Sequence, residues 1–522
     1  MKKTKMISLL TILVLAVCLI GHASGVAKAE ADIPRGGQLR LAMGGQPPSL
    51  DPLMSTTTVN AQLANHIFET LVAYNAEQEV VPMLAEKYEI SADGKVYTFY
   101  LRKGVKFHNG KEMTAEDVVV SMERWLDRST SAKTVVKKAV FEEVDKYTVR
   151  MVVEHPSVLI PQALAHVVQA AAIMPKEIVE SAGPTGVAEF IGTGPYKFDE
   201  WKQDQYIRLV RYEEYQQSPL PSSGYSGQKH AYVDEILFDH APDPSTQLAG
   251  IQTGMYDEVG VHPDSYDMVK NDPNLEFPTP DYNSSGVILL NKNQGPMTNP
   301  KIRKAVQTIV DNEEILIVTA GNFYKLESSF MLKNTPFWYS EAGSEFYNQM
   351  DAKRAKQLLQ EAGYDGEEIV LITSRDYEMA YNGTVVLQQQ LEKIGIKTRI
   401  QVFDWPTLID RVYNHPDLWD VYFIVNPIVP TPLDIIYFSE GFFTGPLDQK
   451  SKDLLVEIRN APSLDMAKEY WDQLQEYSLA EFVPYIKIGA YSDGLRATRK
   501  GVHGGYNFLG LRLYWNVYKT ID

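Results

Sequence analysis

The stretch "RKGVKFHNGKEMTAEDVVVSMERW", residues 102–125, holds the groups that decide between an active site and a scaffold. It contains a basic turn, a histidine, an acidic pair and an apolar run, and histidine and carboxylates are the usual acid–base groups of enzymes. The same residues also have a structural explanation. The His108-Asn109-Gly110 segment suits a turn between a strand and a helix, because Asn-Gly tolerates positive φ.

The acidic pair that follows predicts the first turn of a helix. Thr114-Ala115-Glu116-Asp117 is a capping-box pattern, in which Thr114 caps the helix and Asp117 reaches back to free amide groups. Both acids also suit the positive end of the helix dipole. An apolar stripe follows at helical spacing: Val118, Met122 and Trp125. Each charged residue therefore has a structural role, and we interpret the stretch as scaffold.

The rest of the chain supplies no motif for catalysis. It contains no H-E-x-x-H or G-x-S-x-G pattern, and its ten histidines are scattered without metal-ligand spacing. The segment "GTGPYKF" (192–198) lacks the Lys-Ser/Thr of a phosphate-binding loop and precedes an alternating strand, so it predicts a tight turn. We therefore expect no enzyme activity, no cofactor and no metal ligands.

Length and charge narrow the class further. A chain of 522 residues is too long for one core and suggests two to four domains. Its formal net charge of −17 argues against nucleic acid or an anionic membrane surface as a partner, because both require a basic patch. The composition favours an exported monomer.

The N-terminus predicts an export signal. Three early lysines precede an apolar run from Met6 to Ile20, and Ala27-Lys28-Ala29 offers a small-x-small cleavage site. We expect cleavage after Ala29 and a periplasmic mature protein. Cys18, the only cysteine, lies inside this signal after the bulky Val17, which makes lipid anchoring at that cysteine an unfavoured alternative.

The patterns along the chain predict a mixed α/β protein. Residues 37–43, 95–107, 146–153 and 205–212 alternate with period two and predict strands. Asn299 and Pro300 open a helical pattern, and another runs from Asp351 to Gly363. A third helical pattern ends at Gly395 and leads into a strand over 396–403. Helix and strand thus alternate through 351–403, as in an α/β layer.

The scaffold stretch also belongs to a larger resemblance. With residues 88–101 before it, it resembles the signature of the family 5 extracellular solute-binding proteins, the dipeptide-, oligopeptide- and nickel-binding receptors of ABC importers. Four further blocks resemble that family in the same order: "IGTGPYKFDEWKQDQYIRLVRYEEY" (191–215), "VDEILFDHAPDPSTQLAGIQTGMYD" (233–257), "LLNKNQGPMTNPKIRKAVQTIVDNEEI" (289–315) and "AKQLLQEAGYDG" (355–366).

The resemblance implies a two-lobed α/β fold that closes like a clam, with an extra α/β domain inserted near the N-terminus. The domains expected from it are a signal peptide (1–29), lobe I (30–75, 189–289 and 488–522), the extra domain (76–188) and lobe II (290–487). The segments "SGVILLNK" (285–292) and "VPYIKIGAY" (483–491) are strand-like and are expected to carry the chain between the lobes.

The function that the resemblance implies is capture of a small solute, peptide-like or otherwise carboxylate-bearing, and its delivery to an ABC permease in the inner membrane. Closure around the solute would supply the mechanism. Three alternatives remain open: a secreted hydrolase, a ligand sensor or chaperone with the same fold, and a receptor for a nickel chelate. A hydrolase would need a nucleophile–base pair or a metal site, and the sequence displays neither.

The resemblance also implies ligand contacts. In the dipeptide-binding relatives an arginine after a short strand holds the carboxylate, and Arg375, followed by Tyr377, matches that place. The fork of the guanidinium suits carboxylates. Trp405, Tyr422, Thr56 and Thr57 are further candidate contacts.

This chain lacks the second charged contact that those relatives make with their ligand. Their aspartate for the α-amine would fall near Ile428, within Asn426-Pro427-Ile428-Val429-Pro430, and no acid lies between Tyr422 and Leu433. Asp434 comes several residues later and is assigned to the next helix. Because the prolines stiffen an apolar loop, Asn426, Ile428 and Pro430 are expected to meet an uncharged part of the solute.

Overall fold

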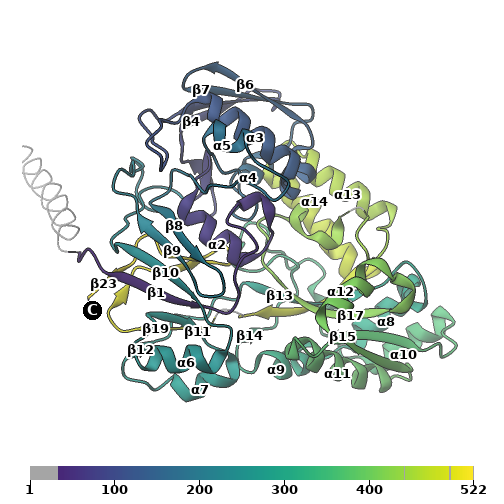
Figure 1. The fold of residues 1–522 in the computed structure, drawn as a ribbon. Coiled ribbons are helices and arrows are strands. Elements are labelled where there is room, and N and C mark those ends of the chain that lie inside the picture. The colour runs from purple at the N-terminus through teal and green to yellow at the C-terminus, as the bar shows by residue number, and fades with distance from the viewer. Residues whose placement is uncertain (1–32, 440, 493–494, 521–522) are drawn as a thin grey trace, which may run out of the picture.

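The computed structural model describes residues 33–439, 441–492 and 495–520. The predicted export signal and Cys18 lie outside the described residues. Figure 1 shows three bodies: lobe I on the left, an inserted domain at the top and lobe II at the lower right. Each body is built on its own sheet. The residues at which the domains divide remain the prediction given above.

Lobe I is defined by a seven-stranded sheet in the order β12-β19-β11-β1-β10-β9-β8. The first strand of the chain, β1, lies at the centre of this sheet and pairs in parallel with β10. Its strands are β1 (Gln38–Met43), β8 (Tyr196–Lys202), β9 (Tyr206–Arg211), β10 (Glu235–His240), β11 (Glu258–Gly260), β12 (Leu275–Glu276) and β19 (Arg496–Arg499), and its helices are α2 (Thr58–Ile67), α6 (Pro244–Gln252) and α7 (Pro263–Val269).

The inserted domain is defined by a four-stranded antiparallel sheet in the order β4-β5-β7-β6. The elements are β4 (Ala85–Ile90), β5 (Val96–Leu101), β6 (Ala139–Asp145), β7 (Thr148–Val153), α3 (Ala115–Arg128), α4 (Ile160–Leu164) and α5 (Lys176–Glu180). The strand expected over 95–107 is too long, because it ends at Leu101 where Gly104 turns the chain with φ +73°.

The scaffold interpretation of the stretch 102–125 is confirmed. The Asp117 carboxylate accepts a hydrogen bond from the Thr114 backbone N–H at 3.0 Å, as a capping box requires. His108 Nε2 lies 3.0 Å from the Gly194 carbonyl, and Nδ1 accepts from the Gly192 N–H at 3.3 Å. The histidine therefore joins two turns. A Cβ at Gly192 would lie 2.1 Å from the Ile67 carbonyl oxygen, so only glycine fits.

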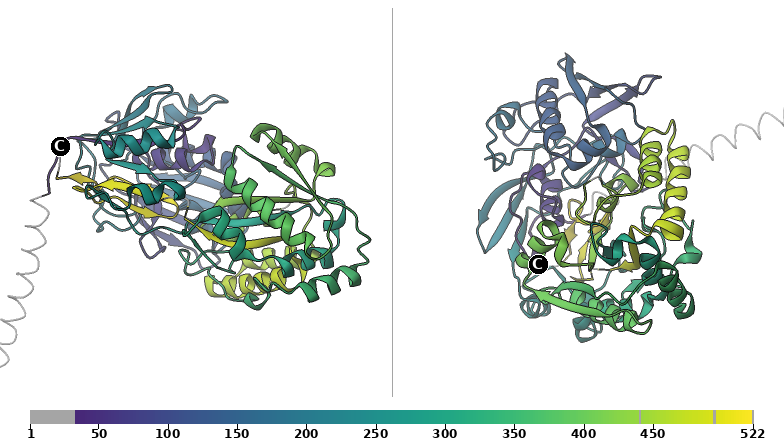
Figure 2. Two further views of the ribbon diagram at one scale, coloured as in Figure 1. Left: turned by 90° about the horizontal axis from the view of Figure 1, so that it is seen from below. Right: turned by 90° about the vertical axis from the view of Figure 1, so that its right-hand side faces the viewer.

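Lobe II is defined by a six-stranded sheet in the order β14-β18-β13-β17-β15-β16. Helices lie on both sides of it (Figures 1 and 2). Its strands are β13 (Ser284–Leu290), β14 (Tyr324–Lys325), β15 (Ile369–Ser374), β16 (Thr398–Phe403), β17 (Val421–Pro427) and β18 (Tyr485–Tyr491). Its helices are α8 (Pro300–Ile309), α9 (Asn312–Ala320), α10 (Ala352–Ala362), α11 (Glu378–Glu392), α12 (Trp405–Asn414), α13 (Gln449–Asn460) and α14 (Leu464–Tyr477).

The two segments expected to cross between the lobes are neighbours in the lobe II sheet. β13 pairs antiparallel with β18 and, on its other side, with β17. Four short hairpin strands complete the C-terminal part of lobe I: β20 (Val502–His503), β21 (Tyr506–Phe508), β22 (Leu511–Leu513) and β23 (Tyr518–Lys519). A further hairpin, β2 (Val72–Tyr74) with β3 (Val80–Pro82), lies where the chain enters the inserted domain.

The inserted domain also touches lobe II. One hydrophobic core runs from Phe99 and Trp125 of the inserted domain to Trp471 and Leu474 of α14. The Ser157 hydroxyl donates to the Arg459 carbonyl at 2.7 Å across the same boundary. The inserted domain therefore packs against α13 and α14 of lobe II.

Candidate functional site

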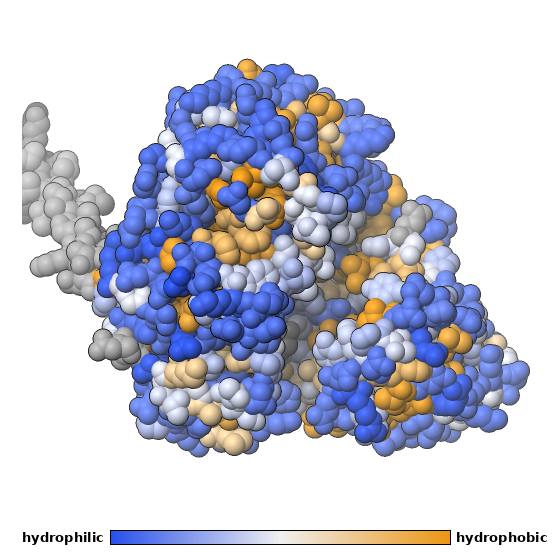
Figure 3. All heavy atoms as spheres, viewed as in Figure 1, coloured by the Kyte–Doolittle hydropathy of each residue, from blue (hydrophilic) through white to orange (hydrophobic). Residues whose placement is uncertain are grey.

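A cavity of about 390 Å³ lies where the three bodies meet. Figure 3 shows the molecular surface hollowed between the left-hand and right-hand parts of the molecule. Thr56 and Leu509 line the cavity from lobe I, and residues 130–134 and 166–169 line it from the inserted domain side. The lobe II wall comes from β13, the segment 330–332, the loop 426–439 and Tyr485 of β18. A solute held here would touch both lobes.

The wall is mainly apolar. The Tyr485 ring lies between those of Phe330 and Tyr437 in tilted contacts, with ring centroids 4.6 Å apart for Phe330 and Tyr485 and 4.8 Å apart for Tyr437 and Tyr485. Burial raises the pKa of the Tyr437 and Tyr485 phenols well above their usual range. Both phenols therefore stay protonated and can donate hydrogen bonds.

One carboxylate, Asp434, lines this cavity among the described residues. Its Oδ2 accepts from the Thr431 hydroxyl at 2.7 Å and from the Thr431 N–H at 3.2 Å, which closes the short 3₁₀ turn Pro432–Asp434. Its Oδ1 lies 3.9 Å from His166 Nε2, on the other side of the domain boundary. Asp434, which the sequence assigns to the next helix, ends this three-residue 3₁₀ turn and also lines the cavity.

Polar groups gather on the sheet side of the cavity. Ser285 and Asn426 are direct cross-strand partners on β13 and β17, and both line the cavity. Lys487 Nζ donates to the Ser285 hydroxyl, and Asn426 Nδ2 donates to the Tyr437 hydroxyl. Lys487 itself is only 1% exposed. A buried ammonium therefore stands directly behind a cavity-lining hydroxyl.

The structure brings four of the sequence-predicted contacts into the cavity wall: Thr56, Asn426, Ile428 and Pro430. Thr57 lies beside them as the N-cap of α2, where its hydroxyl accepts from the Asn60 N–H. A Cβ on Gly510 would come within 3.1 Å of Ile428 Cγ2, so the C-terminal part of lobe I reaches this lobe II loop.

The other predicted contacts lie outside the cavity lining. Arg375 is exposed, and its Nη2 donates to the Tyr381 hydroxyl at 3.0 Å. Tyr377 is 52% exposed and lies against Trp405 with ring centroids 4.4 Å apart. Tyr422 is buried. The roles of these residues as solute contacts stay predictions.

Sequence reasoning missed Ser285, His166 and Lys487. The sequence predicts the strands of Ser285 and Lys487 as segments that connect the lobes. Nothing in their local pattern marks these two residues as polar groups beside a cavity. Cross-strand pairing and the one-residue irregularity between Gly286 and Val287 decide which way they face. The position of His166 in the cavity wall depends on how the inserted domain packs against lobe II, which the sequence does not show.

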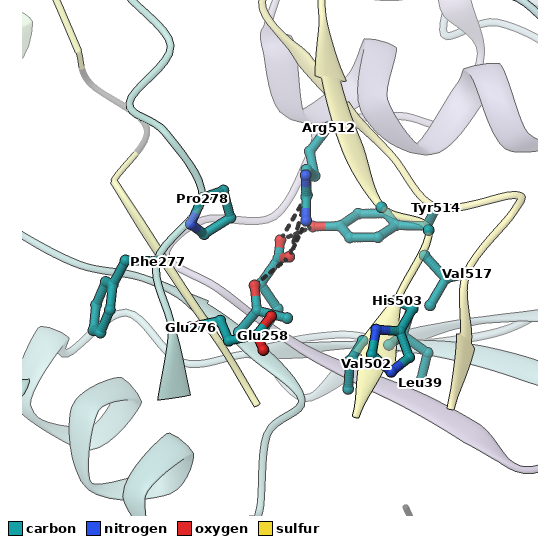
Figure 4. Close-up of a pocket in the computed structure, with 13 residues that line it drawn as sticks. Leu39, Glu258, Glu276, Phe277, Pro278, Val502, His503, Arg512, Tyr514 and Val517 are labelled. Carbon is teal, nitrogen blue, oxygen red and sulfur yellow. Dashed lines mark hydrogen bonds and ion pairs between the residues drawn. The ribbon is translucent and has the colours of Figure 1, made fainter. Parts of the chain in front are cut away.

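A second cavity of about 310 Å³ lies within lobe I, away from the boundary between the lobes. Figure 4 shows the Glu258 carboxylate facing Arg512 and Tyr514. Burial alone would raise the pKa of Glu258, but the guanidiniums of Arg512 and Arg496 hold it below its usual value. Arg512 donates to Glu258 at 2.6 Å and the Tyr514 hydroxyl does so at 2.8 Å. These bonds fasten the C-terminal segment to β11.

Within the described residues there is no cluster of three or more His, Cys, Asp or Glu side chains placed to hold a metal ion. None of the described helices has the length and apolar character needed to span a membrane.

Known proteins resemble the chain along most of its length. The family model for bacterial extracellular solute-binding proteins, family 5 (middle), matches residues 79–446. A probable peptide ABC transporter periplasmic-binding protein, y4tO of Sinorhizobium fredii, is 28% identical over 90% of this chain and 91% of its own. The oligopeptide-binding protein AppA of Bacillus subtilis is 26% identical over 99% of this chain and 98% of its own.

Solved structures share the fold. AppA from Bacillus subtilis in complex with a nonapeptide superposes with a TM-score of 0.76 at 23% identity, covering 94% of this chain and 100% of that one. NikZ from Campylobacter jejuni in complex with Ni(L-His) gives a TM-score of 0.76 at 20% identity, covering 92% of this chain and 99% of that one.

Proposed function

The chain belongs to the bacterial extracellular solute-binding proteins of family 5, and we propose that it captures a peptide-like or other carboxylate-bearing solute in the cavity of about 390 Å³ between its lobes. Proteins of this family are extracytoplasmic receptors that serve ABC importers and are not enzymes. In our proposal the mature chain begins at Glu30, works in the periplasm as a monomer and hands its solute to a permease in the inner membrane.

The observation that supports this proposal most strongly is the origin of the cavity wall. Lobe I, the inserted domain and lobe II all contribute to it. A solute that contacts both lobes binds the closed form more tightly than the open form, and so shifts the population toward closure. The permease would recognise that closed form. No bond is made or broken in this cycle.

The size and chemistry of the cavity support a small, largely apolar solute. A volume of about 390 Å³ is within the usual range for small-molecule sites. The loop Asn426–Pro430 presents aliphatic side chains and prolines, so it suits an uncharged part of the solute. The names of y4tO and AppA, which cite peptides, favour a peptide-like compound.

Closure can be measured by fluorescence transfer between one dye on each lobe. Met268 on α7 is 72% exposed, and Lys353 on α10 is exposed. Met268→Cys and Lys353→Cys in a chain starting at Glu30 would give two unique labelling sites, because Cys18 is the only native cysteine. Addition of peptides and extracts should raise the transfer efficiency for at least one solute. A tightly bound solute that leaves the transfer efficiency unchanged contradicts closure.

A further inference from the structure

Two hydroxyl groups on the sheet side of the cavity already have hydrogen-bond donors. Ser285 Oγ receives a hydrogen bond from the Lys487 ammonium, and the Tyr437 hydroxyl receives one from the Asn426 amide. Among the described residues, no protein acceptor is found for the proton of either hydroxyl. Each hydroxyl therefore keeps its O–H proton available for a solute, together with one acceptor lone pair.

The two hydroxyl groups are connected through Asn426. Ser285 pairs with Asn426 across β13 and β17, and side chains of direct cross-strand partners start only about 5 Å apart. Asn426 in turn contacts Tyr437, so these residues form one continuous polar patch. Around it the wall is apolar, with Val287, Phe330 and Tyr485. A low local dielectric strengthens hydrogen bonds from such a patch.

Lys487 gives this patch a positive charge. Burial lowers the pKa of its ammonium to about 8, while the Glu327 carboxylate raises it. No oxygen of Glu327 forms an ion pair with Lys487 within 4.0 Å in the described part of the chain, so the charge is only partly offset. The group remains mostly protonated at pH 7 and polarises the Ser285 hydroxyl.

We propose that Ser285 and Tyr437 form the subsite that binds an acceptor oxygen of the solute, a carboxylate in the first place, and that Lys487 is the positioning residue behind it. This inference rests on the proposed function and assigns the carboxylate contact to the cavity wall. Arg375, the contact expected from the sequence, lies outside that wall and already donates to Tyr381.

The test compares two probes that differ only at one end. N-acetyl-leucyl-leucine carries a carboxylate, and N-acetyl-leucyl-leucinol carries a hydroxymethyl group in its place. Calorimetry at pH 7 should show that the wild-type protein binds the carboxylate at least tenfold more tightly. Ser285→Ala and Lys487→Met should each reduce this preference to threefold or less. Lys353→Met, the matched control at an exposed lysine of α10, should change it by less than twofold.

A pH series separates a role of Lys487 in positioning from a role in folding. Three groups lie around Lys487: the Ser285 hydroxyl on β13, the Asn312 amide on α9, which donates to the Lys487 backbone carbonyl, and the Glu327 carboxylate after β14. Glu327 in turn interacts electrostatically with Lys333, Lys325 and Tyr347. The wild-type affinity for N-acetyl-leucyl-leucine should fall as the pH rises from 7 to 9, because the ammonium loses its proton. The affinity of Lys487→Met should stay level. Thermal melts establish that each variant is folded.

Three results would overturn the proposal. They are equal affinity of the wild type for both probes, binding of neither probe, and a preference that Arg375→Ala abolishes while Ser285→Ala and Lys487→Met retain it. If either probe still increases the fluorescence transfer between the lobes, the proposed receptor function stands although this subsite is wrong. Should Lys487→Met not fold, the Ser285→Ala variant and the wild-type pH series decide.

Discussion

His66 should make lobe I sensitive to acid, and His66→Gln should remove much of that sensitivity. The histidine lies in α2 and is fully buried. Its Nδ1 contacts the Gln62 carbonyl at 2.7 Å, and its Nε2 accepts from the Tyr514 N–H at 3.1 Å. The ring is therefore held as the neutral tautomer with the proton on Nδ1. A second proton would break the bond that fastens the C-terminal segment.

Burial is the main cause that lowers the pKa of His66 from 6.5 to about 4. The unfolded chain binds the proton first as the pH falls, so the stabilisation is complete above pH 6.5 and is lost between pH 6.5 and 4. A shift of that size corresponds to about 3 kcal/mol in the free energy of unfolding, at about 1.4 kcal/mol per pKa unit.

The assay is urea unfolding, followed by circular dichroism at several pH values from 7.5 to 4.5. The free energy of unfolding of the wild type should fall more steeply with acid than that of His66→Gln. Between pH 7.5 and the acid end, the wild type should lose about 3 kcal/mol more than the variant. His155→Gln, the same change at an exposed histidine, should follow the wild type. His108, whose pKa burial also lowers to about 4, should leave a residual slope. Parallel curves for wild type and His66→Gln would refute the reasoning.

Other features of the chain support further predictions. Mass spectrometry of the protein exported by its host should find Glu30 at the N-terminus, whereas an acylated Cys18 would place the protein on a membrane. Ile428→Asp should raise the affinity for leucyl-leucine with a free amine relative to its N-acetyl form by tenfold or more, because an acid then stands in the apolar loop; unchanged relative affinities would show that the loop does not face the solute. Ser157→Ala should lower the free energy of unfolding by about 1 kcal/mol, as for one lost hydrogen bond that joins the inserted domain to lobe II, and a urea titration that detects no change would assign that contact no weight.

Local chemistry made much of the fold predictable. The capping residues Thr114 and Asn299, and Gly363 in the left-handed conformation at the end of α10, mark helix ends by hydrogen bonds to near neighbours. Such signals need no tertiary structure. Strand ends were less predictable, since the alternation over 95–107 continues past Gly104, where the backbone leaves the sheet.

The candidate site was less predictable, because it is assembled from distant segments. The loop Asn426–Pro430 was identified through its resemblance to a family, and its residues do line the cavity. Ser285 and Lys487 are 202 positions apart, and only the pairing of β13 with β18 brings them together. The sequence places Asp434 at the start of the next helix, where it can cap the turn through Thr431. That local role does not show whether the residue also lines the cavity, because this depends on the packing of distant segments.

The most direct test of the central claim is a crystal structure of the protein as purified from its host, with any retained solute identified by mass spectrometry. Receptors that bind tightly often keep their solute, so electron density should fill the cavity of about 390 Å³ and touch Ser285 on lobe II as well as Thr56 on lobe I. Solute density confined to the cavity beside Glu258 in lobe I, or to the exposed surface around Arg375, would contradict the account.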